Sequence, residues 1–208
     1  MRTEHSGEAG AAGEEQERNG APLAGDDPRA TLFRLLAFLC QIAYAYAAVG
    51  ALRPRKRELR AAFAAGVNTA LFDFFLESLA YGNDLWYCGG GIQKIRVGGR
   101  EFDFLHVPID MVAGFVLTGM TFSLASDAPR LLRRRSVLLR PLFPPALDAA
   151  WKNSFAVGAA LTGAAGDFLS KKWGVWRNAP EWTFPLCAFA AWLPLIALTL
   201  FTYDSLKK

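Results

Sequence analysis

The chain has 208 residues, of which 52% are hydrophobic and 20% are charged, and its formal net charge is +4. This length fits one domain of ordinary size. A basic excess can indicate a nucleic-acid partner, but no recognised nucleic-acid-binding motif is present, so none is expected. The cysteines Cys40, Cys88 and Cys187 lie far apart and form no C-x-x-C pair, which argues against a zinc site or a disulfide framework.

Residues 1–30 are acidic, rich in glycine and alanine, and without apolar periodicity. Such a composition buries too little apolar surface to offset the entropy of ordering the chain. The basic, apolar and small-residue order of a signal peptide is missing. We therefore predict a disordered tail over 1–30 and one transmembrane domain over 31–208.

Long apolar stretches follow, separated by short blocks of charge. A helix of about 20 apolar residues crosses a hydrocarbon core of about 30 Å. We therefore predict an all-α integral membrane protein with a bundle of about five transmembrane helices. The predicted spans are 31–52, 61–81, 105–125, 146–169 and 184–203.

The segments between these spans carry their own signals. Residues 82–104 are polar and glycine-rich, and the stretch 92–97 followed by Gly98 and Gly99 predicts a small β-hairpin. The fourth span is rich in small residues, and Ala159 and Gly163 have the spacing that lets helix backbones approach closely. This pattern predicts that the fourth helix is central in the bundle.

Two loops are strongly basic, whereas loops 82–104 and 170–183 are less so. Basic loops stay on the cytoplasmic side of a membrane. We therefore predict an outside N-terminus and a cytoplasmic C-terminus, in a cell or cytoplasmic membrane. The basic residues are Arg53, Arg55, Lys56, Arg57 and Arg60 in one loop and Arg130, Arg133, Arg134, Arg135 and Arg140 in the other.

Near the start of the fourth span, Asp148 and Lys152 are one helical turn apart. Opposite charges at this spacing can pair on one helix face. We predict a structural ion pair between them.

Aromatic residues gather at the predicted outer boundary, where Trp86, Tyr87, Trp173 and Trp176 follow the second and fourth spans. Rings with a polar edge favour the headgroup level, so an interfacial belt is the favoured reading. A role in substrate binding stays open as the alternative.

Charged groups inside a bilayer are costly, by about 2.5–3.5 kcal/mol on insertion scales, and are functional candidates for that reason. Asp73 and Glu77 share one face of the second span, and His106 and Asp110 share one face of the third. Asp167 ends the fourth span. These residues either form one hydrated catalytic site or only mark helix ends.

Neighbouring carboxylates repel each other when both are ionised, so one of them keeps its proton and can act as a general acid. A metal site is less favoured, because the chain has only two histidines and one of them, His5, is in the tail. No metal is expected, and the sequence favours no particular cofactor.

The pattern of an acid, a glycine and aromatic residues at a helix end occurs over Asp73–Tyr87 and over Asp167–Trp176. It resembles small membrane enzymes of carotenoid and other isoprenoid metabolism. The resemblance implies protonation of an alkene by a carboxylic acid, with aromatic faces stabilising the cation.

Three functions follow as hypotheses. The first is a membrane enzyme with an acid/base site that acts on a lipid or isoprenoid-type substrate, which makes membrane lipid and a lipid-soluble molecule the expected partners. The alternatives are a non-catalytic membrane subunit and a small proton- or cation-coupled transporter. The sequence favours no oligomeric state.

Overall fold

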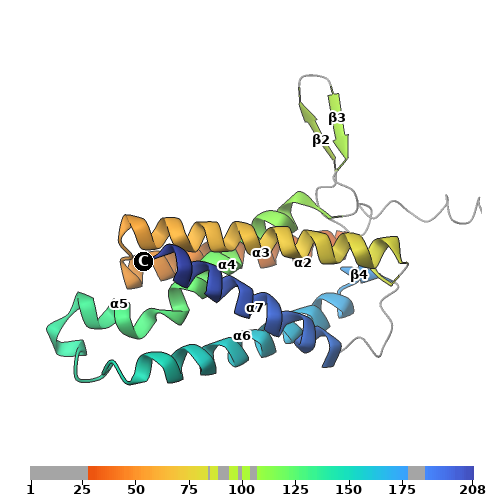
Figure 1. The fold of residues 1–208 in the computed structure, drawn as a ribbon. Helices are drawn as coiled ribbons and strands as arrows, with labels where there is room; N and C mark the ends of the chain where they lie inside the picture. Colours follow the sequence, from red (N-terminus) through yellow and green to blue (C-terminus); the bar gives the residue numbers. More distant parts are fainter. Residues whose placement is uncertain (1–27, 84, 89–93, 98–99, 104–106, 178–185) are drawn as a thin grey trace, which may run out of the picture.

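The computed structural model describes residues 28–208 except 84, 89–93, 98–99, 104–106 and 178–185. Long helices run side by side along one axis, and the C-terminus lies at the same end of the bundle as α5 (Figure 1). The predicted tail lies almost wholly outside the described residues. The helices are α2 (Pro28–Leu52), α3 (Lys56–Gly82), α4 (Ile109–Ser126), α5 (Ala128–Arg135), the 3₁₀ turn η1 (Val137–Leu139), α6 (Leu147–Lys172) and α7 (Leu186–Leu206).

Four of these helices are long and apolar enough to cross a membrane: α2, α3, α4 and the part of α7 from Ala188 onward. Helix α6 has 26 residues, which at about 1.5 Å per residue exceeds the thickness of a hydrocarbon core. Its composition is less apolar, and it is not among the four. The chain is therefore an all-α, multi-pass membrane bundle, while the count of five spans and the orientation stay predictions.

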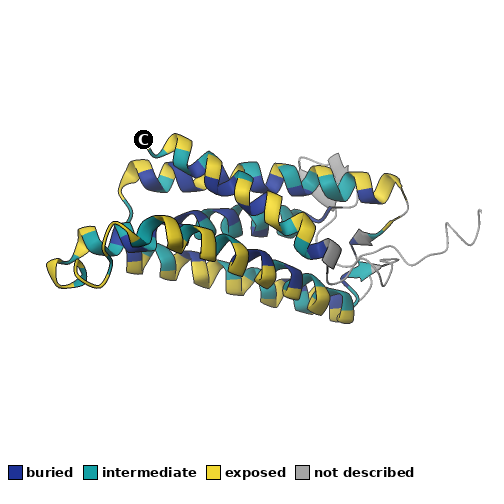
Figure 2. Cartoon of the chain, turned by 60° about the horizontal axis from the view of Figure 1, so that its bottom comes forward, coloured by how far each residue is buried: buried dark blue, intermediate teal, exposed yellow. Residues whose placement is uncertain are grey.

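The outward faces of the helices are apolar. Leu35 on α2, Leu71 on α3 and Phe201 on α7 are all more than half exposed, and exposed residues run along the outer side of the bundle (Figure 2). Burying one such side chain is worth about 1.5–3 kcal/mol, so a surface of this kind is stable in lipid and unfavourable in water. The interior holds many alanines together with larger apolar side chains such as Leu124, Ile196 and Tyr203.

Helix α4 is central in the bundle, because it contacts α2, α3, α6 and α7. Its closest crossing is with α3, where a Cβ atom added to Gly66 would collide with the backbone of Val116. Gly119 faces the same crossing. The prediction that the fourth span is central was therefore wrong, since α6 packs mainly against α7. Small residues are needed where backbones touch, and α3 and α4 touch at these two glycines.

The predicted hairpin is confirmed, as strands β2 (Lys94–Val97) and β3 (Arg100–Asp103) pair antiparallel. A second pairing was not expected from the sequence. Strand β1 (Tyr87–Cys88) pairs antiparallel with β4 (Trp176–Arg177), which ties the loop after α3 to the loop after α6. We call this end of the bundle the tryptophan end.

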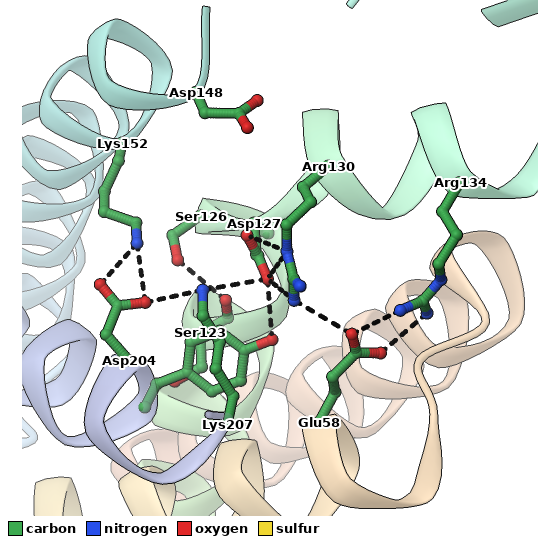
Figure 3. Close-up of polar contacts among 12 residues, drawn as sticks. Glu58, Ser123, Ser126, Asp127, Arg130, Arg134, Asp148, Lys152, Asp204 and Lys207 are labelled. Carbon is green, nitrogen blue, oxygen red and sulfur yellow. Dashed lines mark hydrogen bonds and ion pairs between the residues drawn. The ribbon is translucent and has the colours of Figure 1, made fainter. Parts of the chain in front are cut away.

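The opposite end, where α5 and the C-terminus lie, is closed by a charge network, and we call it the basic end (Figure 3). Glu58 of α3 accepts hydrogen bonds from Arg134 at 2.6 and 2.8 Å and from Arg130 at 3.0 Å. Asp127 also accepts from Arg130, and it pairs with Lys207 at 3.1 Å. The network joins α3, α5 and α7.

The expected pair between Asp148 and Lys152 does not form. Lys152 instead donates to Asp204 of α7 at 2.6 and 2.8 Å, as Figure 3 shows. Asp148 binds Arg133 of α5 at 2.7 and 3.0 Å. Neighbouring elements supply closer and better oriented partners than the same helix does, and each pair therefore joins two elements.

Candidate functional site

Three of the predicted carboxyl groups face one cavity near the tryptophan end. Asp73 and Glu77 come from adjacent turns of α3, and Asp167 comes from the end of α6. The cavity has a volume of about 390 Å³ and is otherwise lined mainly by apolar and aromatic residues, including Leu76 and Leu195. We call it the carboxyl cavity.

The three carboxyl groups differ in their partners. Trp86 Nε1 donates to Glu77 Oε2 at 2.9 Å, and Trp192 Nε1 donates to Asp167 Oδ2 at 2.6 Å. The Asp73 side chain is only 6% exposed, and within the described part of the chain its Oδ2 atom has no hydrogen-bond partner. A buried polar atom without a partner is costly, which marks Asp73 as the group available to a ligand.

Trp192 is a site residue that the sequence did not single out. Its ring stacks on Phe115 of α4, with centroids 5.6 Å apart and planes at 19°. A Cβ atom added to Gly163 would collide with the Trp192 ring, so the ring fits only because residue 163 is a glycine. A tryptophan in an apolar helix needs an acceptor for its indole N–H. The sequence signal for this contact was therefore an acid in a neighbouring span, which is Asp167 of α6.

Asp110 does not join the carboxyl cavity. It accepts hydrogen bonds from Arg34 Nε at 3.0 Å and from Arg34 Nη2 at 2.9 Å. Both residues line a second cavity, of about 520 Å³, between α2, α4 and α6. Arg34 is only 6% exposed, and a buried arginine inside an apolar helix is itself a signal for a buried acidic partner.

Cys88 lies beside this ion pair. Arg34 Nη1 donates to Cys88 Sγ at 3.1 Å, and Cys88 Sγ donates to Met111 Sδ at 3.3 Å. Burial raises the pKa of the Cys88 thiol, in spite of the nearby guanidinium. The thiol is therefore a packed structural group rather than a nucleophile.

Of the predicted aromatic residues, some line the carboxyl cavity and others do not. Trp86 and Trp176 line the carboxyl cavity, where the β1–β4 pairing brings their two loops together. Trp173 stacks on Phe33 with ring centroids 5.6 Å apart and lines neither cavity. The side chain of Tyr87 and the whole of His106 lie outside the described residues.

Among the residues that the structure describes, no group of three or more histidine, cysteine, aspartate or glutamate side chains is arranged to hold a metal ion. The carboxyl groups that line the carboxyl cavity can donate and accept protons.

Comparison with known proteins adds no relative: no protein-family model, no curated protein and no solved structure matches the chain. Fold and site define a multi-pass membrane bundle with a carboxyl-lined cavity.

Proposed function

We propose that the chain is a membrane enzyme that acts on a lipid or isoprenoid-type substrate by proton transfer at Asp73, Glu77 and Asp167. The observation that carries this proposal is the carboxyl cavity itself, in which three acids from α3 and α6 face an otherwise largely apolar space. Such a cavity accepts a hydrocarbon and presents it to a proton donor. If the acids had only a structural role, we would expect other side chains of the protein to fill the space between them.

The cavity also reaches the outer surface of the bundle. Leu79 and Leu85 line it and are 47% and 36% exposed. These exposed leucines give a membrane-dissolved molecule an apolar path to the cavity. This entry favours a substrate that partitions into the bilayer.

In the proposed reaction, Asp73 transfers its proton to one carbon of a C=C bond, and a carbocation forms on the neighbouring carbon. The faces of Trp86 and Trp176 stabilise this cation. Glu77 then removes a proton from the next carbon, and the electron pair of that C–H bond forms a new C=C bond. The net change is an isomerisation of the double bond without an oxidant, and proton exchange between the two carboxyl groups restores the starting state.

The test is lipid analysis in an expressing host that carries the wild-type chain, Asp73→Asn or Glu77→Gln. Both substitutions keep the side-chain size and remove the transferable proton, so we expect the product found with the wild type to be lost, by at least about a hundredfold. Asp148→Asn, at the basic end, is the control and should leave the product unchanged. Equal product from wild type and Asp73→Asn at equal expression would refute the proposal.

Proton- or cation-coupled transport is the second candidate, and one observation favours it. Thr69 lies one turn below Asp73, and its hydroxyl shares a 2.7 Å hydrogen bond with that of Thr199 on α7. Both residues are buried, so they extend a polar line from the carboxyl cavity toward the basic end. Proton uptake into liposomes containing the protein, abolished by Thr69→Val, would favour transport; tight liposomes and unchanged lipids together would favour a non-catalytic subunit.

A further inference from the structure

The second cavity, between α2, α4 and α6, is larger than the carboxyl cavity, at about 520 Å³. Aromatic side chains from three helices line it, among them Phe38, Phe122 and Phe155. It is separated from the carboxyl cavity by a wall of residues common to both, namely Asp167, Trp176 and Trp192.

This wall is firmly held. Trp192 is fixed by its hydrogen bond to Asp167 and by its stacking on Phe115, and the missing side chain of Gly163 leaves room for its ring. Trp192 therefore lies between the two cavities, and each cavity also has lining residues of its own.

Polar atoms without partners indicate what the second cavity holds. In the described part of the chain, three buried side-chain atoms lack a hydrogen-bond partner. Thr121 Oγ1 belongs to a residue that lines only this cavity, and Trp176 Nε1 belongs to a residue that lines both cavities. The third, on Asp73, belongs to the carboxyl cavity. Unpaired polar atoms thus coincide with the two cavities.

Thr121 is unusual for a hydroxyl inside a helix. The hydroxyl groups of Thr69, Thr162 and Thr199 each lie within hydrogen-bond distance of the carbonyl oxygen one turn earlier, at 2.8 to 2.9 Å, which is the usual arrangement in an apolar setting. Thr121 makes no such bond. Its hydroxyl is therefore available to an outside partner.

We propose that this second cavity is a binding site for a hydrocarbon chain that carries a hydroxyl or carbonyl oxygen. The aromatic lining takes up the chain, and the oxygen accepts a hydrogen bond from Trp176 Nε1 or from the Thr121 hydroxyl. Thr121 lies about 16 Å along α4 from Asp110. An ordinary acyl chain has no polar atom at the level of Thr121, so its saturated part fits this site less well. The site does not depend on proton transfer at Asp73.

The position of the site can be tested with a pair of matched variants. Ala37→Phe fills only the second cavity and Ala191→Phe fills only the carboxyl cavity, because each alanine lines one of them. The probe is farnesol, titrated against the purified protein in detergent and followed by quenching of tryptophan fluorescence. We expect farnesol to bind the Ala191→Phe protein and the Asp73→Asn protein, and to lose at least about tenfold in affinity for this site in Ala37→Phe.

The chemistry of the site is tested by comparing farnesol with farnesene, which has the same carbon skeleton, one more C=C bond and no oxygen. In the Ala191→Phe background we expect farnesol to bind about three- to tenfold more tightly, which is the effect of one hydrogen bond. Thr121→Val or Trp176→Phe should remove this preference, whereas Thr162→Val, whose hydroxyl already has a partner, should keep it.

Two results would overturn the proposal. One is equal binding of farnesol and farnesene by the Ala191→Phe protein, in which the carboxyl cavity is filled. The other is farnesol binding that survives Ala37→Phe and disappears in Ala191→Phe, which would place the only ligand in the carboxyl cavity. Failure of the proposed enzyme activity leaves both readouts unchanged, so the two proposals are tested separately.

Discussion

At the scale of single residues, the buried carboxyl groups of the carboxyl cavity are the main feature. Asp73, Glu77 and Asp167 lie among apolar side chains, and two of the three are held by tryptophan N–H groups. The sequence predicted that these acids are costly inside a membrane. It did not predict which tryptophans would satisfy them: Trp86 turns back to Glu77 from the loop directly after α3, and Trp192 approaches Asp167 from α7.

Asp110 illustrates the opposite outcome. The spacing of His106 and Asp110 placed both residues with the other acids, yet Asp110 binds Arg34 from another helix. A guanidinium that donates two hydrogen bonds is a stronger partner for a buried carboxylate than a neighbouring carboxyl group. Spacing along one helix gives the face of a residue but not the charge that another helix brings to it.

Cys88 provides a prediction at the same scale. Because the pKa of its buried thiol is raised, the thiolate fraction stays small even at about pH 8.5. With Cys40 and Cys187 replaced by serine, we expect no reaction of the native protein with N-ethylmaleimide at that pH, and full reaction after denaturation. Mass spectrometry of the intact chain measures both. Rapid labelling of the native protein would contradict the described packing of Cys88.

At the scale of helices, the long apolar stretches were sufficient to predict the elements. Each predicted span coincides with a helix, and the ends differ by a few residues, as with α3, which begins at Lys56 rather than near residue 61. The packing order was harder, because several spans contain small residues. The backbone contact lies at Gly66 and Gly119, whereas Gly158 and Gly166 would meet nothing if a Cβ atom were added.

This difference gives a prediction for a matched pair of glycines. Gly66→Ala places a methyl group against the backbone of Val116, so α3 and α4 must separate, at a cost of about 1–3 kcal/mol. Gly158→Ala should be neutral or slightly stabilising, since alanine favours a helix. Thermal unfolding in one detergent compares them. A Gly66→Ala protein as stable as the wild type would show that this crossing is looser than described.

At the scale of the whole molecule, the two ends of the bundle have different tasks. Polar atoms at the tryptophan end are partly unpaired and face cavities, whereas charged groups at the basic end pair with one another across α3, α5, α6 and α7. The sequence predicted the basic loops of this end as a signal for the orientation of the chain in the membrane. Its network was not predictable, because the acidic partners Glu58, Asp127 and Asp204 are distributed along the sequence.

The network should contribute to stability in proportion to its burial. The Glu58 side chain is 6% exposed and binds two arginines, so Glu58→Gln should lower the free energy of unfolding by about 1–3 kcal/mol. Asp148 is 36% exposed in its pair with Arg133, so Asp148→Asn should cost less than about 1 kcal/mol. Thermal melts at low and high salt test this order, and a reversed order would contradict the proposed role of Glu58.

The proposed function requires that a membrane-dissolved hydrocarbon reaches the carboxyl cavity. The most direct measurement is photo-crosslinking of the protein in lipid bilayers with a prenyl alcohol that carries a diazirine, followed by mapping of the labelled peptides. The account predicts labelling of α3 and α7 around Asp73 and Leu195, which Ala191→Phe reduces. Labelling confined to the outer face of α2, and unchanged by that substitution, would contradict it.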